Sequence, residues 1–196
     1  MSAKDYGLGG RLALAERDEL SVAQRGLFDH ISNTAVRWAQ RSGFAANTPD
    51  GRLIGPFNPS LLSPALAMAF LQLQEAEQQH TSLDERVRQV VILTVGAVWQ
   101  APYELYAHSA VARHAGLSEA VIAELTRGSE PEELSDAQTA AHRLARQLST
   151  GHRVDQAVYD HAEQIFGAAG VFDITVLTGI YHTVCAILAA FAIPAP

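Results

Sequence analysis

The sequence predicts an all-α protein of seven or eight helices, and three observations support this fold class. Apolar residues recur at three- and four-residue steps along most of the chain, which is the period of one buried helical face. Serine followed three residues later by Gln or Glu opens several of these stretches, as in a helix capping box. No pair of alternating stretches joined by a tight turn indicates a β-hairpin. We therefore expect a single domain over residues 1–196, without a linker.

The N-terminal region predicts a helix followed by a loop. Ser21 and Gln24 fit a capping box, apolar residues then recur as far as Trp38, and Gly43 is placed to end the helix. Residues 1–45 are thus expected to form an N-terminal helical extension. Because four prolines and two glycines follow, residues 46–64 are expected to form an ordered loop.

The middle of the chain predicts two further helices. Ser63 and Pro64 fit an N-cap and a first helical position, and this helix runs toward His80. Ser82 and Glu85 fit a second capping box, which opens an apolar stretch as far as residue 98. This stretch is rich in valine, so a buried strand competes with a helix. Its length of about sixteen residues favours the helix.

Helices are predicted for the rest of the chain as well. Pro102 is placed to start a helix that ends near Gly116, and a capping box at Ser135 and Gln138 opens another. Three further helices are predicted: one that starts at Leu117-Ser118 and ends at 128–131, a short one at 155–166 and an apolar one at 171–191.

Composition excludes several classes of partner. The chain has 14 Lys and Arg against 21 Asp and Glu, a net charge of −7, so we expect no nucleic-acid partner and no binding to an anionic membrane. Asp173 and other polar residues interrupt the apolar C-terminal stretch, which argues against a membrane span. A single cysteine, Cys185, cannot form an internal disulfide. Together with the lack of a signal-peptide pattern, this predicts a cytoplasmic protein.

The candidate catalytic residues are Glu104 and His108. They lie four residues apart, so both side chains project from one face of the predicted helix. The helix N-terminus is expected to keep Glu104 ionised, and this carboxylate can hold the imidazole for proton transfer. Two alternatives stay open: an ordinary helix-stabilising pair, and a metal site that lacks an obvious third ligand.

The same stretch resembles the carboxymuconolactone decarboxylase and alkylhydroperoxidase D-like superfamily. The resemblance rests on Glu104-Leu-Tyr-Ala-His108 with Gly116-Leu-Ser118, on Gly51–Phe57 ahead of Leu61–Pro64, and on the C-terminal segment from Gly167. It covers about residues 50–196. It implies an AhpD-like multi-helix bundle, a homo-oligomer (trimer or hexamer), a pocket near the start of the Pro102 helix and a role in the catabolism of aromatic compounds.

The resemblance also separates two branches of the superfamily. The peroxidase branch carries Cys-x-x-Cys-x-x-x-His with a glutamate on the preceding helix. Here Ala101 and Glu104 stand in place of the cysteines and Gln89 in place of the glutamate. Peroxide reduction through a disulfide needs both thiols, so a thiol peroxidase is not expected. The cysteine-free decarboxylase branch fits better and implies His108 as the acid–base group, with Glu104 orienting it.

We therefore expect a cofactor-independent lyase or isomerase that acts on a lactone or another organic acid, with no metal. A non-catalytic binding or assembly protein and a metal-dependent hydratase or hydrolase are the alternatives. Polar or aromatic side chains near the pair, in the loop or in the last helix are candidates for substrate binding, and these are Gln89, Trp99, Tyr103, Phe57, Tyr181, His182 and Arg52.

Overall fold

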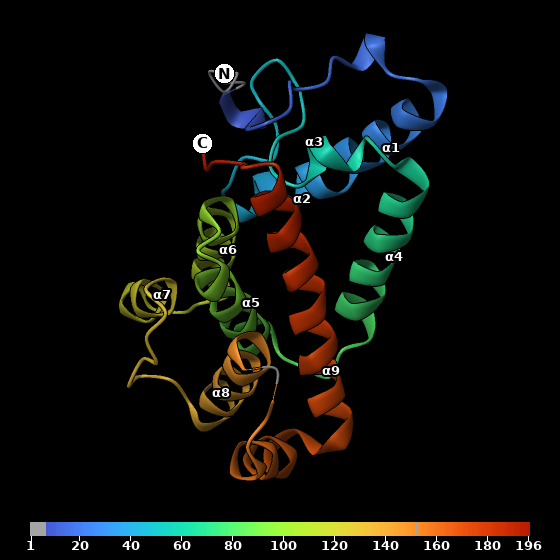
Figure 1. The fold of residues 1–196 in the computed structure, drawn as a ribbon. Coiled ribbons are helices and arrows are strands. Elements are labelled where there is room, and N and C mark those ends of the chain that lie inside the picture. The colour runs from blue at the N-terminus through green and yellow to red at the C-terminus, as the bar shows by residue number, and fades with distance from the viewer. Residues whose placement is uncertain (1–6, 152) are drawn as a thin grey trace.

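The computed structural model describes residues 7–151 and 153–196 and confirms the all-α fold class (Figure 1). Eight helices of the described part exceed two turns, as predicted. In chain order the elements are the 3₁₀ turns η1 (Gly7–Gly9) and η2 (Arg17–Glu19), then α1 (Val22–Asn33), α2 (Ala35–Ser42), α3 (Phe57–Ser60), α4 (Pro64–His80), α5 (Glu85–Trp99), α6 (Pro102–His114), α7 (Glu119–Thr126), α8 (Asp136–Thr150) and α9 (Gln156–Ala190).

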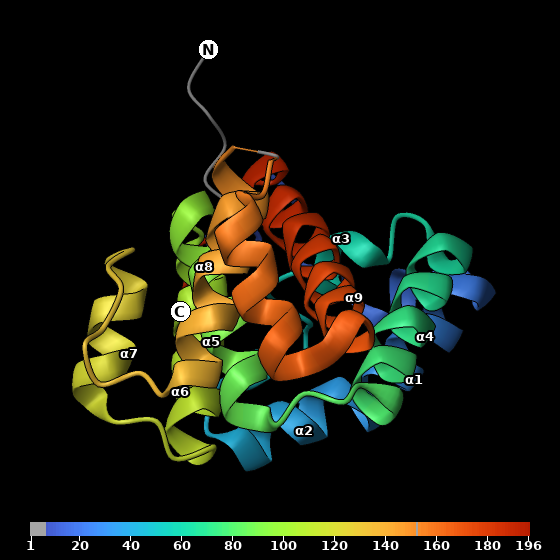
Figure 2. The same ribbon diagram turned by 90° about the horizontal axis from the view of Figure 1, so that it is seen from below.

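Helix α5 is the centre of the bundle. Every residue from Val87 to Gly96 is buried, because α5 packs against α6, α7, α8 and α9 (Figures 1 and 2). Apolar residues therefore face neighbours all round this helix, which explains why its sequence lacks a polar face. The valine-rich stretch is a helix and not the competing strand.

Helix α9 joins the two C-terminal helices that the sequence predicts. Gly167 interrupts it with φ 67° and ψ 172°, a backbone conformation outside the helical region, and the axis changes direction there (Figure 1). By length and composition α9 could also span a membrane. In this structure it packs against α4, α5, α6 and α8. The expected absence of a membrane segment stays a prediction.

Helix α4 forms an outer wall of the molecule. It lies on the opposite side of α9 from α6 in Figure 1 and contacts α1 and α9. None of its residues is fully buried. Four apolar side chains of α4 pack against the core while partly buried, namely Ala67, Met68, Phe70 and Leu71. Polar contacts, which are described with the site below, add to this packing.

The N-terminal extension contains two helices where one was predicted. The capping box of Ser21 and Gln24 is present, and Gly43 ends the second helix in a left-handed conformation, as expected. Thr34, however, has φ −116° and ψ −81° and separates α1 from α2. The loop over 46–64 is also not free of structure, since it holds α3.

The predicted capping box at Ser82 is wrong. The N-cap of α5 is Asp84, whose side chain accepts a hydrogen bond from the backbone N–H of Val87 at 3.0 Å. Ser82 instead donates its hydroxyl to Asp173 of α9 at 2.8 Å. A tertiary contact thus replaces the local one, and it ties the start of α5 to α9. The capping box of Ser135 and Gln138 is confirmed.

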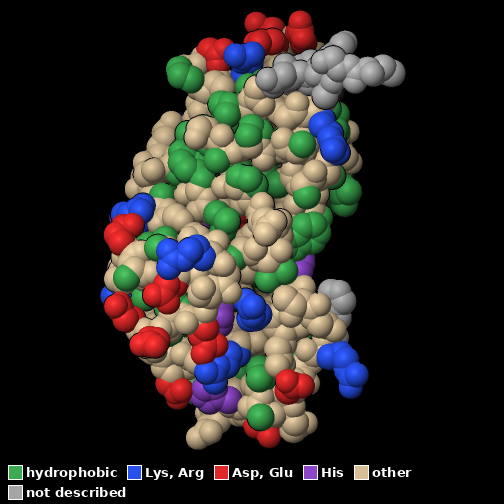
Figure 3. All heavy atoms as spheres, turned by 60° about the vertical axis from the view of Figure 1, so that its left-hand side comes forward, with side chains coloured by type: hydrophobic (Ala, Val, Ile, Leu, Met, Phe, Trp, Pro, Cys, Tyr) green, Lys and Arg blue, Asp and Glu red, His purple; other side chains and the backbone are tan. Residues whose placement is uncertain are grey.

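Hydrophobic side chains also lie on the surface. Figure 3 shows them gathered over the upper half of one face, with charged side chains mostly below. Large apolar side chains that are exposed among the described residues are Val22, Leu62, Leu66, Leu73, Trp99 and Phe172. The expected homo-oligomer stays a prediction.

Gly55 provides a test of the packing between the loop and α6. It has φ +64°, and a Cβ atom there would lie 2.3 Å from Cζ of the buried Tyr103. We expect Gly55→Ala to lower the free energy of unfolding by about 3 kcal/mol, because Tyr103 must move. Gly51→Ala is the control, since Gly51 also has positive φ (+91°) but no atom within 4 Å of the added Cβ. It should cost about 1 kcal/mol in urea denaturation. Equal losses would contradict the close contact.

Candidate functional site

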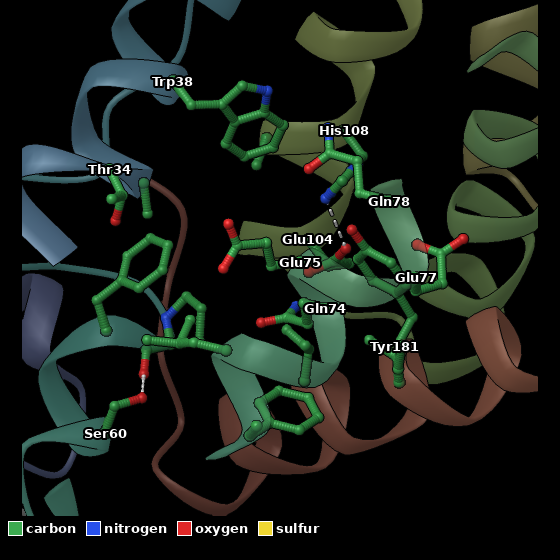
Figure 4. A pocket seen from close by; sticks show the side chains of 18 of the residues that line it. Thr34, Trp38, Ser60, Gln74, Glu75, Glu77, Gln78, Glu104, His108 and Tyr181 are labelled. Carbon is green, nitrogen blue, oxygen red and sulfur yellow. Dashed lines mark hydrogen bonds and ion pairs between the residues drawn. The ribbon is translucent and has the colours of Figure 1, made fainter. Parts of the chain in front are cut away.

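A cavity of about 470 Å³ lies between the outer helices α1, α2 and α4 and the inner helices α5, α6 and α9 (Figure 4). About half of the side chains that line it are aromatic or aliphatic, and the others are polar or charged. A small molecule in this cavity would therefore meet both apolar surface and hydrogen-bonding groups. The aromatic side chains that line it are Trp38, Phe44, Phe57, Phe70, Tyr103 and Tyr181.

Glu104 and His108 lie together on one side of this cavity. Both come from α6, which Pro102 starts at its first position. Oε1 of Glu104 lies 3.2 Å from Nε2 of His108. This approach does not have hydrogen-bond geometry, so Oε1 is a buried oxygen without a hydrogen-bond partner. The predicted pairing of the two side chains is confirmed, and one oxygen keeps an unused hydrogen-bonding capacity.

Close packing of α5 against α6 buries the pair. Gly96 of α5 faces α6, and a Cβ atom there would lie 3.3 Å from Cγ of Glu104 and 3.1 Å from Cδ2 of Leu105. A glycine therefore lets the two helices approach closely. As a result Glu104 is only 3% exposed and His108 only 6%.

Gln89 determines which nitrogen of His108 carries the proton. Its amide nitrogen donates to Oε1 of Glu85 at 2.7 Å, so its oxygen is left to face Nδ1 of His108 at 2.8 Å. An amide oxygen only accepts, so Nδ1 of His108 must be the donor. The lone pair of the neutral imidazole is then on Nε2, which faces Glu104.

A buried ion cluster lies beside Gln89. Arg88 of α5 donates to both oxygens of Glu77 on α4, at 3.2 and 2.6 Å, and to Oε2 of Glu85 at 2.8 Å. The side chains of Arg88 and Glu77 are 8% and 5% exposed. This bidentate pair holds α4 on the bundle, and it is stable in a buried place because each charged group is hydrogen-bonded.

Burial changes the ionisation of the catalytic candidates. Loss of water raises the pKa of Glu104 to about 8. Burial, together with the positive charge of Arg88, lowers the pKa of His108 to about 3. At neutral pH the pair is therefore mostly a carboxylic acid beside a neutral imidazole. The expectation that the helix N-terminus keeps Glu104 ionised is wrong, because desolvation outweighs the helix dipole.

Two aromatic rings flank the pair. The ring of Tyr181 meets the ring of His108 edge to face, with centroids 4.9 Å apart at 87°. The indole of Trp38 lies 6.2 Å away at 49°, and Figure 4 shows it on the other side of His108 from Tyr181. These rings limit the shape of a molecule that can reach Glu104.

The structure brings together most of the residues predicted from the sequence. Glu104, His108, Gln89, Phe57, Tyr103 and Tyr181 line the cavity. Trp99 and His182 do not, since Nε1 of Trp99 donates to Nδ1 of His182 at 2.7 Å and Nε2 of His182 bonds to Ser149 at 2.9 Å.

Arg52 also lies outside this cavity. It pairs with Asp50 at 2.8 Å and with Glu16 at 3.2 Å, beside a smaller surface hollow. The substrate-binding role predicted for Arg52, Trp99 and His182 therefore has no support from their positions.

Cys185 is placed as predicted, on α9. Its side chain is buried in the hydrophobic core, and burial raises the pKa of the thiol above its ordinary value. A buried thiol of this kind is unreactive. Within residues 7–151 and 153–196, no three His, Cys, Asp or Glu side chains gather as a metal-binding group.

The sequence analysis missed Trp38, Glu77 and Arg88. A signal existed for Arg88, because an arginine among valines in a buried helix needs a carboxylate partner. No comparable signal marks Trp38 and Glu77. They reach the cavity only because α2 and α4 pack across it.

Residues 64–147 match the model of the carboxymuconolactone decarboxylase family. Comparison with curated proteins found no match. Among solved structures, the chain is similar to an AhpD-core, peroxidase-related protein from Ralstonia eutropha JMP134, at 16% identity and a TM-score of 0.74, over 95% of this chain and 92% of the other.

Two further structures share the fold. A protein from Agrobacterium tumefaciens described as a putative antioxidant defence protein AhpD has 20% identity and a TM-score of 0.65, over 71% of this chain and 96% of the other. A cysteine-to-alanine variant of the debrominase Bmp8, in complex with 2,3,4-tribromopyrrole, has 14% identity and a TM-score of 0.71, over 100% of this chain and 94% of the other. At these identities the likeness shows a common AhpD-like fold.

The raised pKa of Glu104 predicts how stability depends on pH. The folded protein keeps a proton that the unfolded chain releases above its ordinary pKa of 4.5, so stability falls as the pH rises toward about 8. Between about pH 6.5 and 8 the free energy of unfolding should fall by up to about 1.4 kcal/mol per pH unit from this group. His108 acts mainly below this window, since its pKa is lowered from 6.5.

Glu104→Gln should remove this loss of stability, as measured by urea denaturation across the window. Glu132→Gln is the matched control, because Glu132 is exposed. Its free energy of unfolding should fall with pH as steeply as that of the unchanged protein. A slope that persists in Glu104→Gln would contradict the protonated state of this carboxyl.

Proposed function

We propose that the chain is an enzyme that transfers a proton between carbon atoms of a lactone or another carbon acid. The match of residues 64–147 to the carboxymuconolactone decarboxylase family and the AhpD-like fold support this proposal. The observation that supports this most directly is Glu104, a buried carboxyl with an unpartnered oxygen beside an aromatic-walled cavity. A pKa near 8 suits an acid–base group, because both its forms are populated near neutral pH.

In the proposed reaction Glu104 is the group that accepts and returns the proton. Its carboxylate form removes the proton on the carbon next to the substrate carbonyl, and the electron pair of that C–H bond moves into an enolate. In an unsaturated lactone the enolate is extended, so the carboxylic acid can return the proton to the γ-carbon. The double bond then shifts, and the enzyme recovers its starting state. A positioned acid–base group of this kind accelerates a reaction typically by about 10²–10⁴-fold.

His108 and Gln89 position Glu104 in this proposal. Nε2 of His108, whose lone pair faces the carboxyl, lies 3.2 Å from Oε1 of Glu104 and limits the position of this oxygen without forming a hydrogen bond to it. The low pKa of the imidazole keeps that lone pair free at neutral pH. These roles are the reverse of those expected from the sequence, which predicted His108 as the acid–base group and Glu104 as the residue that orients His108.

The scaffold and the residues fit this chemistry better than that of a thiol peroxidase. The chain has one cysteine, and it is buried in the core. The debrominase of similar fold was crystallised with a small ring compound, which supports a proposal that a ring enters the corresponding space here.

The test is isomerisation of α-angelica lactone, an uncharged β,γ-unsaturated γ-lactone, followed by NMR in D₂O. We expect double-bond migration with deuterium incorporation, and kcat/KM that rises about tenfold per pH unit up to about pH 8 and is level above it, because the carboxylate is the active form. Glu104→Gln should lower kcat/KM by about 100-fold or more.

His114→Ala is the control, since His114 lies on the same helix but is exposed at its end, and it should retain full activity. Equal rates for the unchanged protein and Glu104→Gln, whether fast or at the uncatalysed level, would contradict the proposal. In that case a binding protein on the same scaffold becomes the better account.

A further inference from the structure

Every charge at the inner end of the cavity is already bonded within the protein. The guanidinium of Arg88 is shared by two carboxylates, Glu77 and Glu85. A ligand carboxylate that entered here would meet no free cation. It would also lie near a cluster whose net charge is −1, because two carboxylates share a single guanidinium.

The carboxylates of this cluster are equally unavailable to a cationic ligand. Both oxygens of Glu77 accept from Arg88, and the two oxygens of Glu85 accept from Arg88 and Gln89. A ligand ammonium would have to displace one of these bonds, and so leave the buried Arg88 with one partner fewer. Such a loss is costly in a desolvated place. The side chain of Glu77 is buried as well, whereas that of Glu85 is 46% exposed and is screened by water.

The groups that face the ligand space directly carry no charge. Burial keeps Glu104 mostly protonated at neutral pH and His108 neutral. Oε1 of Glu104 is the buried oxygen here that lacks a hydrogen-bond partner among the described residues. The rings of Trp38 and Tyr181 flank His108. A ligand at this end would therefore meet aromatic surface and uncharged polar groups, namely the Glu104 carboxyl and the amides of Gln74 and Gln78 (Figure 4).

The remaining charged or titratable lining residues belong to the outer helices. Arg41 of α2 and Glu75 of α4 are exposed, and His30 of α1 is half-buried. Oε1 of Glu75 accepts a hydrogen bond from Gln79 at 3.0 Å on the same helix. Water screens exposed charges, so these residues contribute little to selectivity at Glu104.

We infer that the inner end of the cavity takes an uncharged ring and selects against both carboxylates and ammonium ions. This rests on the proposed function only for the identification of the cavity as the substrate site. It narrows the substrate from organic acids and lactones to compounds whose reacting part is uncharged, which favours isomerisation over decarboxylation of an acid.

The test compares three ring compounds of similar size: phenol, benzoate and benzylammonium. Trp38 lines the cavity and Trp99 does not, and the chain has two tryptophans. In Trp99→Phe, quenching of Trp38 fluorescence therefore reports binding in the cavity. At about pH 7 we expect phenol to bind at least about tenfold more tightly than either charged compound, because each of them must enter without a partner of opposite charge.

Glu77→Gln in the same background frees part of the charge of Arg88. It should narrow the ratio of phenol to benzoate affinity at least about threefold. Glu85→Gln removes the other carboxylate of the cluster and should act in the same direction, which keeps the test valid if Glu77→Gln loosens α4. Glu132→Gln is the matched control, since it makes the same charge change at an exposed residue that does not line the cavity, and the ratio should stay within about twofold.

Benzoate or benzylammonium binding as tightly as phenol would overturn the inference, and so would the absence of quenching by phenol at millimolar concentration. An effect of Glu132→Gln as large as that of Glu77→Gln would do the same. This experiment measures binding and not turnover. Its outcome therefore does not depend on whether Glu104 proves to be catalytic in the lactone assay.

Discussion

The candidate site depends on one buried guanidinium. Arg88 extends from the central helix and holds Glu77, and this contact positions α4, a helix that buries none of its own residues completely. Partly buried apolar side chains of α4, among them Phe70 and Leu71, pack against the core as well. The same guanidinium holds Glu85, which orients Gln89, which in turn fixes the proton of His108 on Nδ1. A single ion cluster thus closes the cavity and sets the tautomer of the imidazole.

The ionisation of Glu104 follows from helix packing. A glycine at 96 lets α6 lie close to α5, and the nearest polar neighbour of the carboxyl is an imidazole whose own pKa is low. A carboxylate in this place would be desolvated and would have no bonded cation, so the protonated form of Glu104 has the lower free energy. The cavity therefore combines a proton source with surroundings that contain little free charge.

Local patterns in the sequence predicted much of the fold. The capping boxes at Ser21 and Ser135 and the spacing of Glu104 and His108 involve residues within one helix, and the structure confirms them. The capping box predicted at Ser82 is absent because Asp173, far along the chain, accepts the hydrogen bond from the Ser82 hydroxyl. The same reason explains the missed pair of Glu77 and Arg88. Which face of a long apolar helix meets the cavity is also a tertiary property, so the sequence could not tell that Tyr181 lines the cavity while its neighbour His182 does not.

Glu104 and His108 and the two rings that flank His108 come from different parts of the chain. Residues 64–147, which match the family, contain Glu104, His108, Gln89 and the whole ion cluster. The rings that flank His108 come from outside this segment, Trp38 from the N-terminal extension and Tyr181 from the last helix. The family match therefore covers the pair and the ion cluster but not these two rings, so the surroundings of His108 are completed by segments before and after residues 64–147.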